Sequence, residues 1–182
     1  MKNVNWNDVQ DEVRTPVPGG YAAKITRVED NEEKEYLKIE WEFADGEFKG
    51  VNKEVYDAFG YWPLAFVCSY KEKALRFFKG FKTAIEESNP RFVFENNPQS
   101  LVGKFVGVVL GEEEYFSTKH NEVRKRLYVA EKRSGKAIRE GNYDIPALKK
   151  LDSSKIPSSY SAGSAPTNNF AVIDDDDADL PF

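Results

Sequence analysis

Cysteine and histidine are almost absent from this chain, and their scarcity excludes several kinds of chemistry. The 182 residues include one cysteine, Cys68, and one histidine, His120. A single thiol rules out an intrachain disulfide and any zinc site built from several thiolates. His120-Asn121-Glu122 has the His-x-Glu spacing of zinc deaminases, but the chain has no Pro-Cys-x-x-Cys partner for it. We therefore expect His120 to be a loop residue, Cys68 to be a small buried group, and the protein to be a non-enzyme that needs no cofactor and no metal.

Long apolar runs are also missing. No stretch approaches the about 20 residues that span a bilayer, and residues 1–6 have no apolar segment of signal-peptide type. We therefore expect a cytoplasmic protein, or one made in the cytoplasm of a host, with no membrane partner. Aromatic residues are plentiful by contrast: the 13 Phe, 9 Tyr and 3 Trp exceed what one small core needs, so we expect some rings at the surface.

The net negative charge of the chain belongs to its C-terminal region. The formal charge is −5, and the residues from Leu151 onward, with one lysine and six aspartates, account for all of it. Residues 1–150 therefore sum to zero, with 25 basic and 25 acidic residues. Two stretches of this neutral body are strongly basic, residues 71–82 and 119–139. A neutral body with basic stretches can hold a polyanion locally.

The chain ends in aspartates followed by apolar residues. Exposed Leu180 and Phe182 would each leave about 2 kcal/mol of burial unrealised. They make sense if a partner protein buries them while the aspartates steer its approach, although a solvated acidic end is the simpler alternative. The predicted partner-binding tip consists of Asp174, Asp175, Asp176, Asp177, Asp179, Leu180, Pro181 and Phe182.

Composition divides the chain into four parts. A polar arm, residues 1–18, is followed by a folded domain, residues 19–151. Residues 153–169 are rich in Ser, Pro, Gly and Asn, which predicts a flexible linker over 152–173 before the tip, residues 174–182.

Alternation predicts the first strands of the domain. Residues 21–29 have the composition of a strand, and residues 36–43 alternate between apolar and polar side chains, which indicates a strand with one buried face. Asp45-Gly46 suits a tight hairpin turn, so we expect a third strand over residues 48–56. Residues 57–70 fit no single pattern, since Gly60 and Pro63 break a stretch crowded with aromatic side chains.

A helix and two more strands complete the domain. Ser69-Tyr70-Lys71-Glu72 fits a capping box, and residues 88–90 end the helix. Residues 101–116 and 124–133 are then predicted as strands, and 138–151 as a short helix or irregular cover. The predicted apolar stripe of the helix is Ala74, Leu75, Phe77, Phe78, Phe81, Ala84 and Ile85.

The predicted order of three strands, a helix and two strands is that of an OB-fold. We therefore expect a mainly β domain, an OB-like five-stranded barrel, although other α+β domains share this order. Gly103 and Gly107 fit the tight bends of barrel closure.

A surface for single-stranded nucleic acid is the best-supported binding site. Such surfaces combine cations that follow the phosphates with rings that stack on bases, at about 1–3 kcal/mol per base. Each ring also has a structural alternative, and a loop aromatic often plugs a barrel end. The basic helix face of Arg76, Lys79 and Lys82 is better explained as solvated surface. The predicted DNA-binding residues are Tyr36, Lys38, Lys53, Tyr61, Trp62, Lys104, Arg124, Arg126 and Tyr128.

Several segments resemble those of a known family. They are residues 19–21, 35–40, 46–50, 69–75, 77–81, 102–104 and 107–115. The sequence is similar there to a family of small proteins from the replication and recombination regions of phages that infect Gram-positive bacteria. The tip resembles the C-terminal tip of bacterial and phage single-stranded DNA-binding proteins.

The resemblance implies an OB-type core that coats single-stranded DNA, in a host cell, and recruits replication or recombination proteins through the tip. It leaves open a homo-oligomer, dimer or higher. Three other readings also stay open: an adaptor or inhibitor that binds a host replication or repair protein without DNA, an RNA-binding barrel, and a nuclease.

Overall fold

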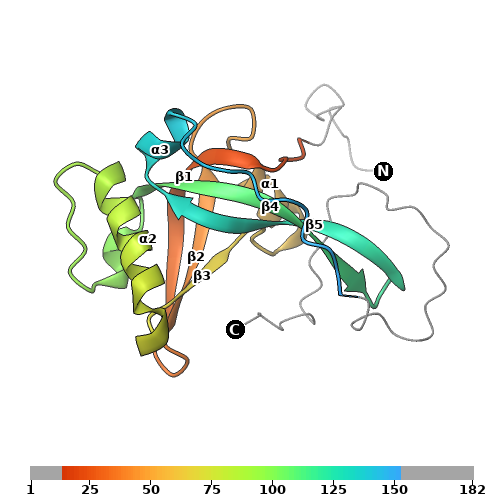
Figure 1. Cartoon of the computed structure of the whole chain (residues 1–182), viewed down its shortest axis with the longest axis horizontal. Coiled ribbons are helices and arrows are strands. Elements are labelled where there is room, and N and C mark those ends of the chain that lie inside the picture. The colour runs from red at the N-terminus through yellow and green to blue at the C-terminus, as the bar shows by residue number, and fades with distance from the viewer. Residues whose placement is uncertain (1–13, 153–182) are drawn as a thin grey trace, which may run out of the picture.

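The computed structural model describes residues 14–152. The predictions for residues 1–13, for the linker from residue 153 and for the C-terminal tip lie outside the described residues. The helices and strands are β1 (Gly19–Asn31), β2 (Tyr36–Phe43), α1 (Val51–Phe59), β3 (Phe66–Ser69), α2 (Leu75–Ser88), β4 (Phe105–Ser117), β5 (Glu122–Arg133) and α3 (Gly135–Arg139) (Figure 1). Two short 3-10 turns, η2 (Glu72–Ala74) and η3 (Pro98–Leu101), precede α2 and β4.

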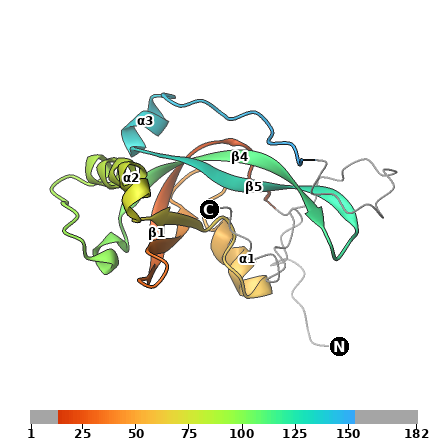
Figure 2. The ribbon, with the colours of Figure 1, turned by 60° about the horizontal axis from the view of Figure 1, so that its bottom comes forward.

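The five strands form one antiparallel sheet in the order β3-β2-β1-β4-β5. The two outer strands of this order approach each other across a seam, because the Lys132 ammonium of β5 lies 5.2 Å from the Phe66 ring centroid of β3. Helix α2 packs on the sheet near this seam, where it contacts β3, β4 and β5 (Figure 2). The fold is therefore mainly β and OB-like, as predicted, with a partly open barrel.

Strand β2 confirms the alternation in the sequence. Its odd-numbered residues are fully buried, whereas Tyr36 and Lys38 point away from the core. The Trp41 ring packs edge-on against Phe43 at 4.8 Å, and its indole N–H donates to the Leu64 carbonyl at 2.6 Å. The inner face of the sheet is thus the core, and its outer face is the surface available for binding.

The third strand predicted over residues 48–56 is wrong, because this segment forms helix α1 instead. Phe48, Val51 and Val55 recur at spacings of three and four residues, and all three side chains contact the core in that helical arrangement. The Glu42 carboxylate of β2 accepts hydrogen bonds from the first amides of α1, which no residue of the helix itself can satisfy. The third strand is β3, whose four residues are too few to show a period.

The predicted capping box and part of the predicted stripe of α2 are also wrong. Ser69 ends β3 and accepts a hydrogen bond from the Lys71 amide at 3.3 Å, while the α-helix begins only at Leu75, after η2. Phe81 lies in the core, but Leu75 is 50% exposed and Phe77 is 71% exposed, with the Arg76 guanidinium 5.2 Å from the Phe77 ring centroid. The rings of Phe78 and Phe81 already fill the space beneath this turn of the helix.

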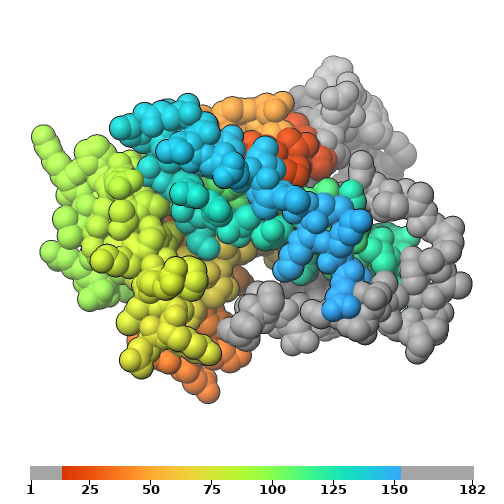
Figure 3. Space-filling model, in the orientation of Figure 1, coloured from red at the N-terminus to blue at the C-terminus, as the bar shows by residue number. Residues whose placement is uncertain are grey.

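Residues 135–151 form a strap over the outer face of β1 and β4 (Figure 3). This agrees with the short helix or irregular cover predicted over residues 138–151. The strap fits there because the strands beneath it carry glycines. A Cβ atom on Gly20 would lie 2.4 Å from the Tyr143 ring, and one on Gly107 would lie 2.4 Å from Ile138. The Lys149 amide and carbonyl then pair with Glu112 and Glu114 on the edge of β4 that β1 leaves free.

Candidate nucleic-acid interface

The outer face of β2 holds two of the predicted DNA-binding residues side by side. Lys38 lies opposite Glu29 of β1 and Val67 of β3, and Tyr36 lies between Asn31 and Ser69. The Tyr36 hydroxyl accepts a hydrogen bond from the side-chain amide nitrogen of Asn31 at 3.3 Å. The Tyr36 side chain is half-buried. The Lys38 side chain is exposed and forms no ion pair with any described residue. We call Tyr36, Lys38, Val67 and Ser69 the β2–β3 face.

Carboxylates surround the β2–β3 face. Arg27 pairs with Glu29 at 3.6 Å and with Glu40 at 3.5 Å. On the core side of the sheet, where Asp30 lies opposite Leu37, the Tyr70 hydroxyl donates to Asp30 at 2.8 Å, and burial together with this contact raises the pKa of Tyr70 to about 12. The turn between β1 and β2 carries Glu32, Glu33 and Glu35 against Lys34. Lys38 is therefore the cation of this face that is available to a phosphate, and Tyr36 is the neighbouring ring.

The outer face of β5 holds Arg124, Arg126 and Tyr128, pointing outward as predicted. Arg124 pairs with Glu122 at 2.5 Å. Arg126 pairs with Glu113 at 2.8 Å, and its guanidinium lies 5.0 Å from the centroid of a neighbouring tyrosine ring on β4. We call Arg124, Arg126 and Tyr128 the β5 face; both of its cations are already neutralised.

The strap covers part of the β5 face. The Tyr128 ring lies against Gly111, where a Cβ atom would be 3.0 Å from it, and the Lys149 ammonium lies 5.8 Å from the ring centroid. Lys149 also pairs with Glu113 at 3.2 Å, so this carboxylate holds both Lys149 and Arg126. The Tyr128 side chain is therefore half-buried in packing contacts, so its ring is not free to stack on a base.

Tyr61 and Trp62 lie in the loop after α1, within a group of rings. Trp62 packs on Tyr56, with centroids 5.5 Å apart, and Tyr61 on Phe59 at 6.3 Å. The Trp62 indole N–H donates to the Trp41 carbonyl at 2.8 Å, on the part of the β2 edge that short β3 leaves unpaired. Phe59 is 63% exposed. We call Tyr56, Phe59, Tyr61 and Trp62 the aromatic cluster; sequence reasoning missed Tyr56 and Phe59, although the crowding of rings in this segment was a signal.

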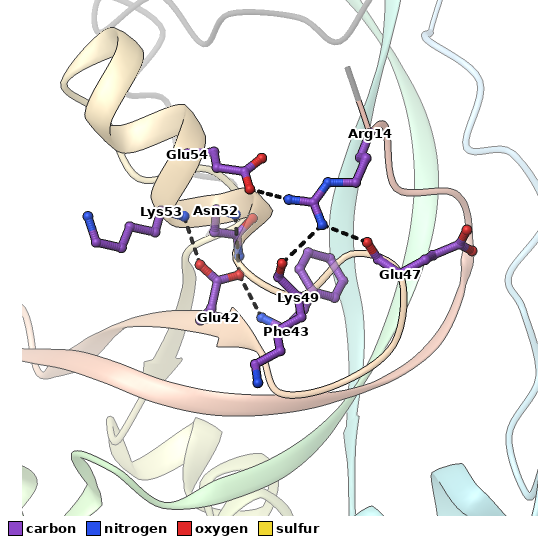
Figure 4. A network of polar contacts seen from close by, with 8 residues as sticks. All are labelled: Arg14, Glu42, Phe43, Glu47, Lys49, Asn52, Lys53 and Glu54. Atoms are coloured by element: carbon purple, nitrogen blue, oxygen red, sulfur yellow. Dashed lines mark hydrogen bonds and ion pairs between the residues drawn. The ribbon is translucent and has the colours of Figure 1, made fainter. Parts of the chain in front are cut away.

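Lys53 does not join the β2–β3 face, because it belongs to α1. Its ammonium pairs with Asp57 at 2.6 Å, and its backbone amide donates to Glu42 at 2.7 Å (Figure 4). In the same network, the Arg14 guanidinium donates to the Glu47 and Lys49 carbonyls at 2.9 and 3.2 Å and contacts the Glu54 carboxylate. This network anchors the start of the described chain to α1.

Lys104 occupies a fourth location. It precedes β4, and its ammonium lies 4.5 Å from the Phe92 ring centroid. The nine predicted DNA-binding residues therefore lie on two strand faces, on α1 with its following loop, and at the start of β4. The structure brings Tyr36 next to Lys38, and it brings Arg124 next to Arg126 and Tyr128.

The groups that could support catalysis are few. Cys68 is buried beneath β3, as predicted, and desolvation raises the pKa of its thiol to about 12 even though the nearby Lys132 lowers it. His120 lies in the turn between β4 and β5. Within residues 14–152, no three His, Cys, Asp or Glu side chains are grouped so that they could hold a metal ion. Over the same residues, no helix is long and apolar enough to cross a bilayer.

Comparison with known proteins adds no relative. The sequence matches no protein-family model and no curated protein.

Proposed function

We propose that this protein binds single-stranded DNA on the β2–β3 face. The observation that carries the proposal is the pair of half-buried Tyr36 and exposed Lys38 on the outer face of β2 of an OB-like sheet. OB-folds bind oligonucleotides on the face of their second and third strands. Tyr36 would stack on a base while Lys38 neutralises an adjacent phosphate, and no bond of the DNA is changed.

The charges around this face set the character of the binding. Because Arg27 is held by Glu29 and Glu40, few phosphates would be neutralised. We therefore infer that stacking supplies most of the affinity and that the dependence on salt is shallow, with a slope of about −0.7 for each phosphate contacted. Such a protein would prefer flexible pyrimidine strands over duplex DNA, whose bases are not free to stack.

The predicted tip completes the proposal. Asp174 to Phe182 would recruit replication or recombination proteins in the cytoplasm of a host cell, as the resemblance to phage proteins implies. The tip carries the apolar and acidic groups that a peptide-binding pocket with a basic rim would recognise.

Fluorescence anisotropy with labelled poly-dT, duplex DNA and RNA over a salt series tests the proposal. We expect poly-dT to bind more tightly than duplex, and the double variant Tyr36→Ala/Lys38→Ala to lose this binding. The double variant Arg76→Ala/Lys79→Ala is the matched control, because these basic residues lie on the exposed side of α2. Equal binding of duplex and poly-dT, or no binding, would contradict the proposal.

A second candidate function is favoured by the aromatic cluster. Phe59 and Tyr56 are exposed, whereas Arg14 and Lys53 are paired with the α1 carboxylates of Glu54 and Asp57. A neutral surface rich in rings fits a protein partner better than a phosphate backbone. The alternative is thus an adaptor or inhibitor that binds a host replication or repair protein without DNA, and the anisotropy experiment distinguishes the two because such an adaptor binds no oligonucleotide.

A further inference from the structure

Strand β5 is a long strand with one unpaired edge. Its twelve residues pair with β4 along one edge, and it stands at the end of the sheet order, so no described strand pairs with the other edge. Exposed strand edges offer rows of backbone donors and acceptors to another chain. Short strands, bulges and covering elements usually protect them, and β5 has one bulge, at Ala130.

The unpaired edge belongs to a projecting part of the molecule. The ladder between β1 and β4 ends at Leu110, but β4 and β5 continue as a hairpin to Ser117 and Glu122 (Figures 1 and 2). Beyond Leu110 the strap supports the hairpin, through the backbone contacts of Lys149 and through the ion pair of Lys149 with Glu113. A two-stranded hairpin is marginally stable alone, and a further strand stabilises it.

We propose that the edge of β5 pairs antiparallel with β5 of a second copy of this chain, about a two-fold axis at Leu127. The proposal rests on the sequence of β5, which complements itself in this register and in no other register with its axis between Arg124 and Val129. It does not depend on DNA binding. Because the axis is perpendicular to the sheet, each residue meets a partner on the same face of the joined sheet.

The ladder with β4 defines which face each residue of β5 occupies. Val109 pairs with Glu131 and Leu110 with Val129, so Ala130 is the extra residue of a bulge. The even-numbered residues before the bulge therefore share the outer face with the odd-numbered residues after it. With the axis at Leu127, this residue opposes its own copy. On either side of it, Arg126 opposes Tyr128 and Lys125 opposes Val129. Further out, Arg124 opposes Glu131 and Glu122 opposes Arg133.

Every other face-preserving register with its axis between Arg124 and Val129 opposes like charges. An axis at Arg124, Lys125 or Arg126 places each of these residues opposite its own copy. An axis at Tyr128 opposes Lys125 to Lys132, and an axis at Val129 opposes Arg126 to Arg133. Like charges directly opposite each other destabilise a strand pair, whereas opposite charges and ring pairs stabilise it.

Two of the four charges that would pair between copies are accessible, and the other two, Arg124 and Glu122, pair with each other and are 20% and 29% exposed. Glu131 and Arg133 pair with each other at 2.7 Å, with side chains 43% and 46% exposed, so each can turn to a new partner. Beyond Val129 the strand approaches β3 and α2, where Gly135 donates to the Ser88 hydroxyl at 2.9 Å. We therefore place the shared backbone ladder at residues 125–129 and treat the contacts of Glu131 and Arg133 as side-chain contacts beyond its ends.

A charge-exchange experiment with the full chain tests the partner. We expect Arg124→Glu and Glu131→Arg each to weaken dimerisation by about tenfold in sedimentation velocity, because each places like charges opposite each other. An equimolar mixture of the two variants should recover the wild-type dimer, since the mixed pair again opposes Glu to Arg at both ends. A wild-type protein that stays monomeric at high concentration, or a mixture as weak as its components, would overturn the proposal.

Disulfide trapping tests the register. In the Cys68→Ser background, Leu127→Cys should cross-link under mild oxidation, because Cα atoms opposed in an antiparallel pair are about 4.5–5.5 Å apart, within disulfide range. Lys125→Cys is the matched control on the same face, and its two copies would be four residues out of register. If Lys125→Cys cross-links as fast as Leu127→Cys, the register is wrong.

Discussion

The outer faces of β2 and β5 carry the same kinds of residue but differ in what surrounds them. Both place a tyrosine and at least one basic residue outward on alternating positions. On β2, Lys38 has no carboxylate partner among the described residues and Tyr36 makes one hydrogen bond. On β5, Arg126 is held by Glu113, and Tyr128 is packed between Gly111 and the strap.

The difference shows that alternation along a strand decides which way a side chain points, while its neighbours across the sheet decide whether it is available. Three successive glutamates on β4, residues 112–114, lie beside the basic run of β5, and the carboxylates of Glu112 and Glu113 pair with Lys125, Arg126 and Lys149. Strand β2 has only Glu29 and the apolar Val67 beside Lys38.

The largest expected difference between the two faces concerns their tyrosines. Tyr36→Ala should weaken poly-dT binding by about 5- to 150-fold, the loss expected for one stacked base at 1–3 kcal/mol. Tyr128→Ala should leave the affinity unchanged, because its ring is engaged by the strap. Anisotropy titrations of both variants measure the contrast, and Tyr36→Phe, which keeps the ring, is the control. Equal losses at the two tyrosines would remove the distinction between the faces.

A smaller effect should follow from releasing the cations of β5. Glu113→Gln removes the carboxylate that holds both Arg126 and Lys149. We expect poly-dT affinity at low salt to rise by about threefold, since two cations become free to contact phosphate. Glu87→Gln on the exposed side of α2 makes the same change in net charge and controls for it. If both variants gain the same poly-dT affinity, the ion pairs of Glu113 are not the reason that the β5 face contributes no binding.

The dependence on salt offers a finer comparison. Lys38→Ala should reduce the steepness of log K against log salt by about 0.7, the contribution of one phosphate on a single strand. Arg126→Ala should leave the slope unchanged because its charge is already compensated by Glu113. Binding isotherms at several salt concentrations give both slopes. A reduced slope for Arg126→Ala would place a phosphate on β5.

The smallest expected effect is at Cys68, beneath the β2–β3 face. Burial raises the pKa of its thiol from 9.0 to about 12, so the thiol should resist alkylation in the folded protein at pH 8 and react after denaturation. The same resistance in Tyr36→Ala and Lys38→Ala would show that these variants lose binding without losing the fold. Rapid alkylation of either variant would attribute its loss to unfolding.

The pKa of Cys68 also sets a pH dependence. Because the pKa is raised in the folded state, the thiol contributes stability that is complete below pH 9 and is lost as the pH rises toward 12. Urea titrations from pH 8 upward measure this loss of stability. The Cys68→Ala variant should lack the part of the loss that comes from the thiol. An identical decline in both proteins would contradict the assignment.

Sequence patterns predicted the strands that are long and half-buried. Residues 36–43 show a clear period of two because one whole face of β2 lies in the core. The pattern failed at residues 48–56, where Phe48, Val51 and Val55 fit a helix as well as a strand and where Glu42, in another element, completes the helix start. It also failed at β3, because four residues are too few to show a period. These residues are held as a strand by pairing with β2.

The structure confirms the outward direction predicted for four residues, but it does not group all of the predicted residues on one surface. Tyr36, Lys38, Arg126 and Tyr128 all point outward as their strand positions predict. The local sequence could not show that Arg126 meets Glu113, which is 13 residues away, or that Lys149 reaches the same carboxylate from 36 residues away. Ion pairs of this kind depend on strand register, which is set by the packing of the whole sheet.

Composition places the net negative charge after residue 150, and the period of two along β2 assigns its side chains to the inner or the outer face of the sheet. Which cations are free depends on the packing of the whole sheet. A lysine and an arginine on outward positions look alike along the chain, but the carboxylates packed beside them differ. Coulomb attraction at about 3 Å then neutralises Arg126 and leaves Lys38 available.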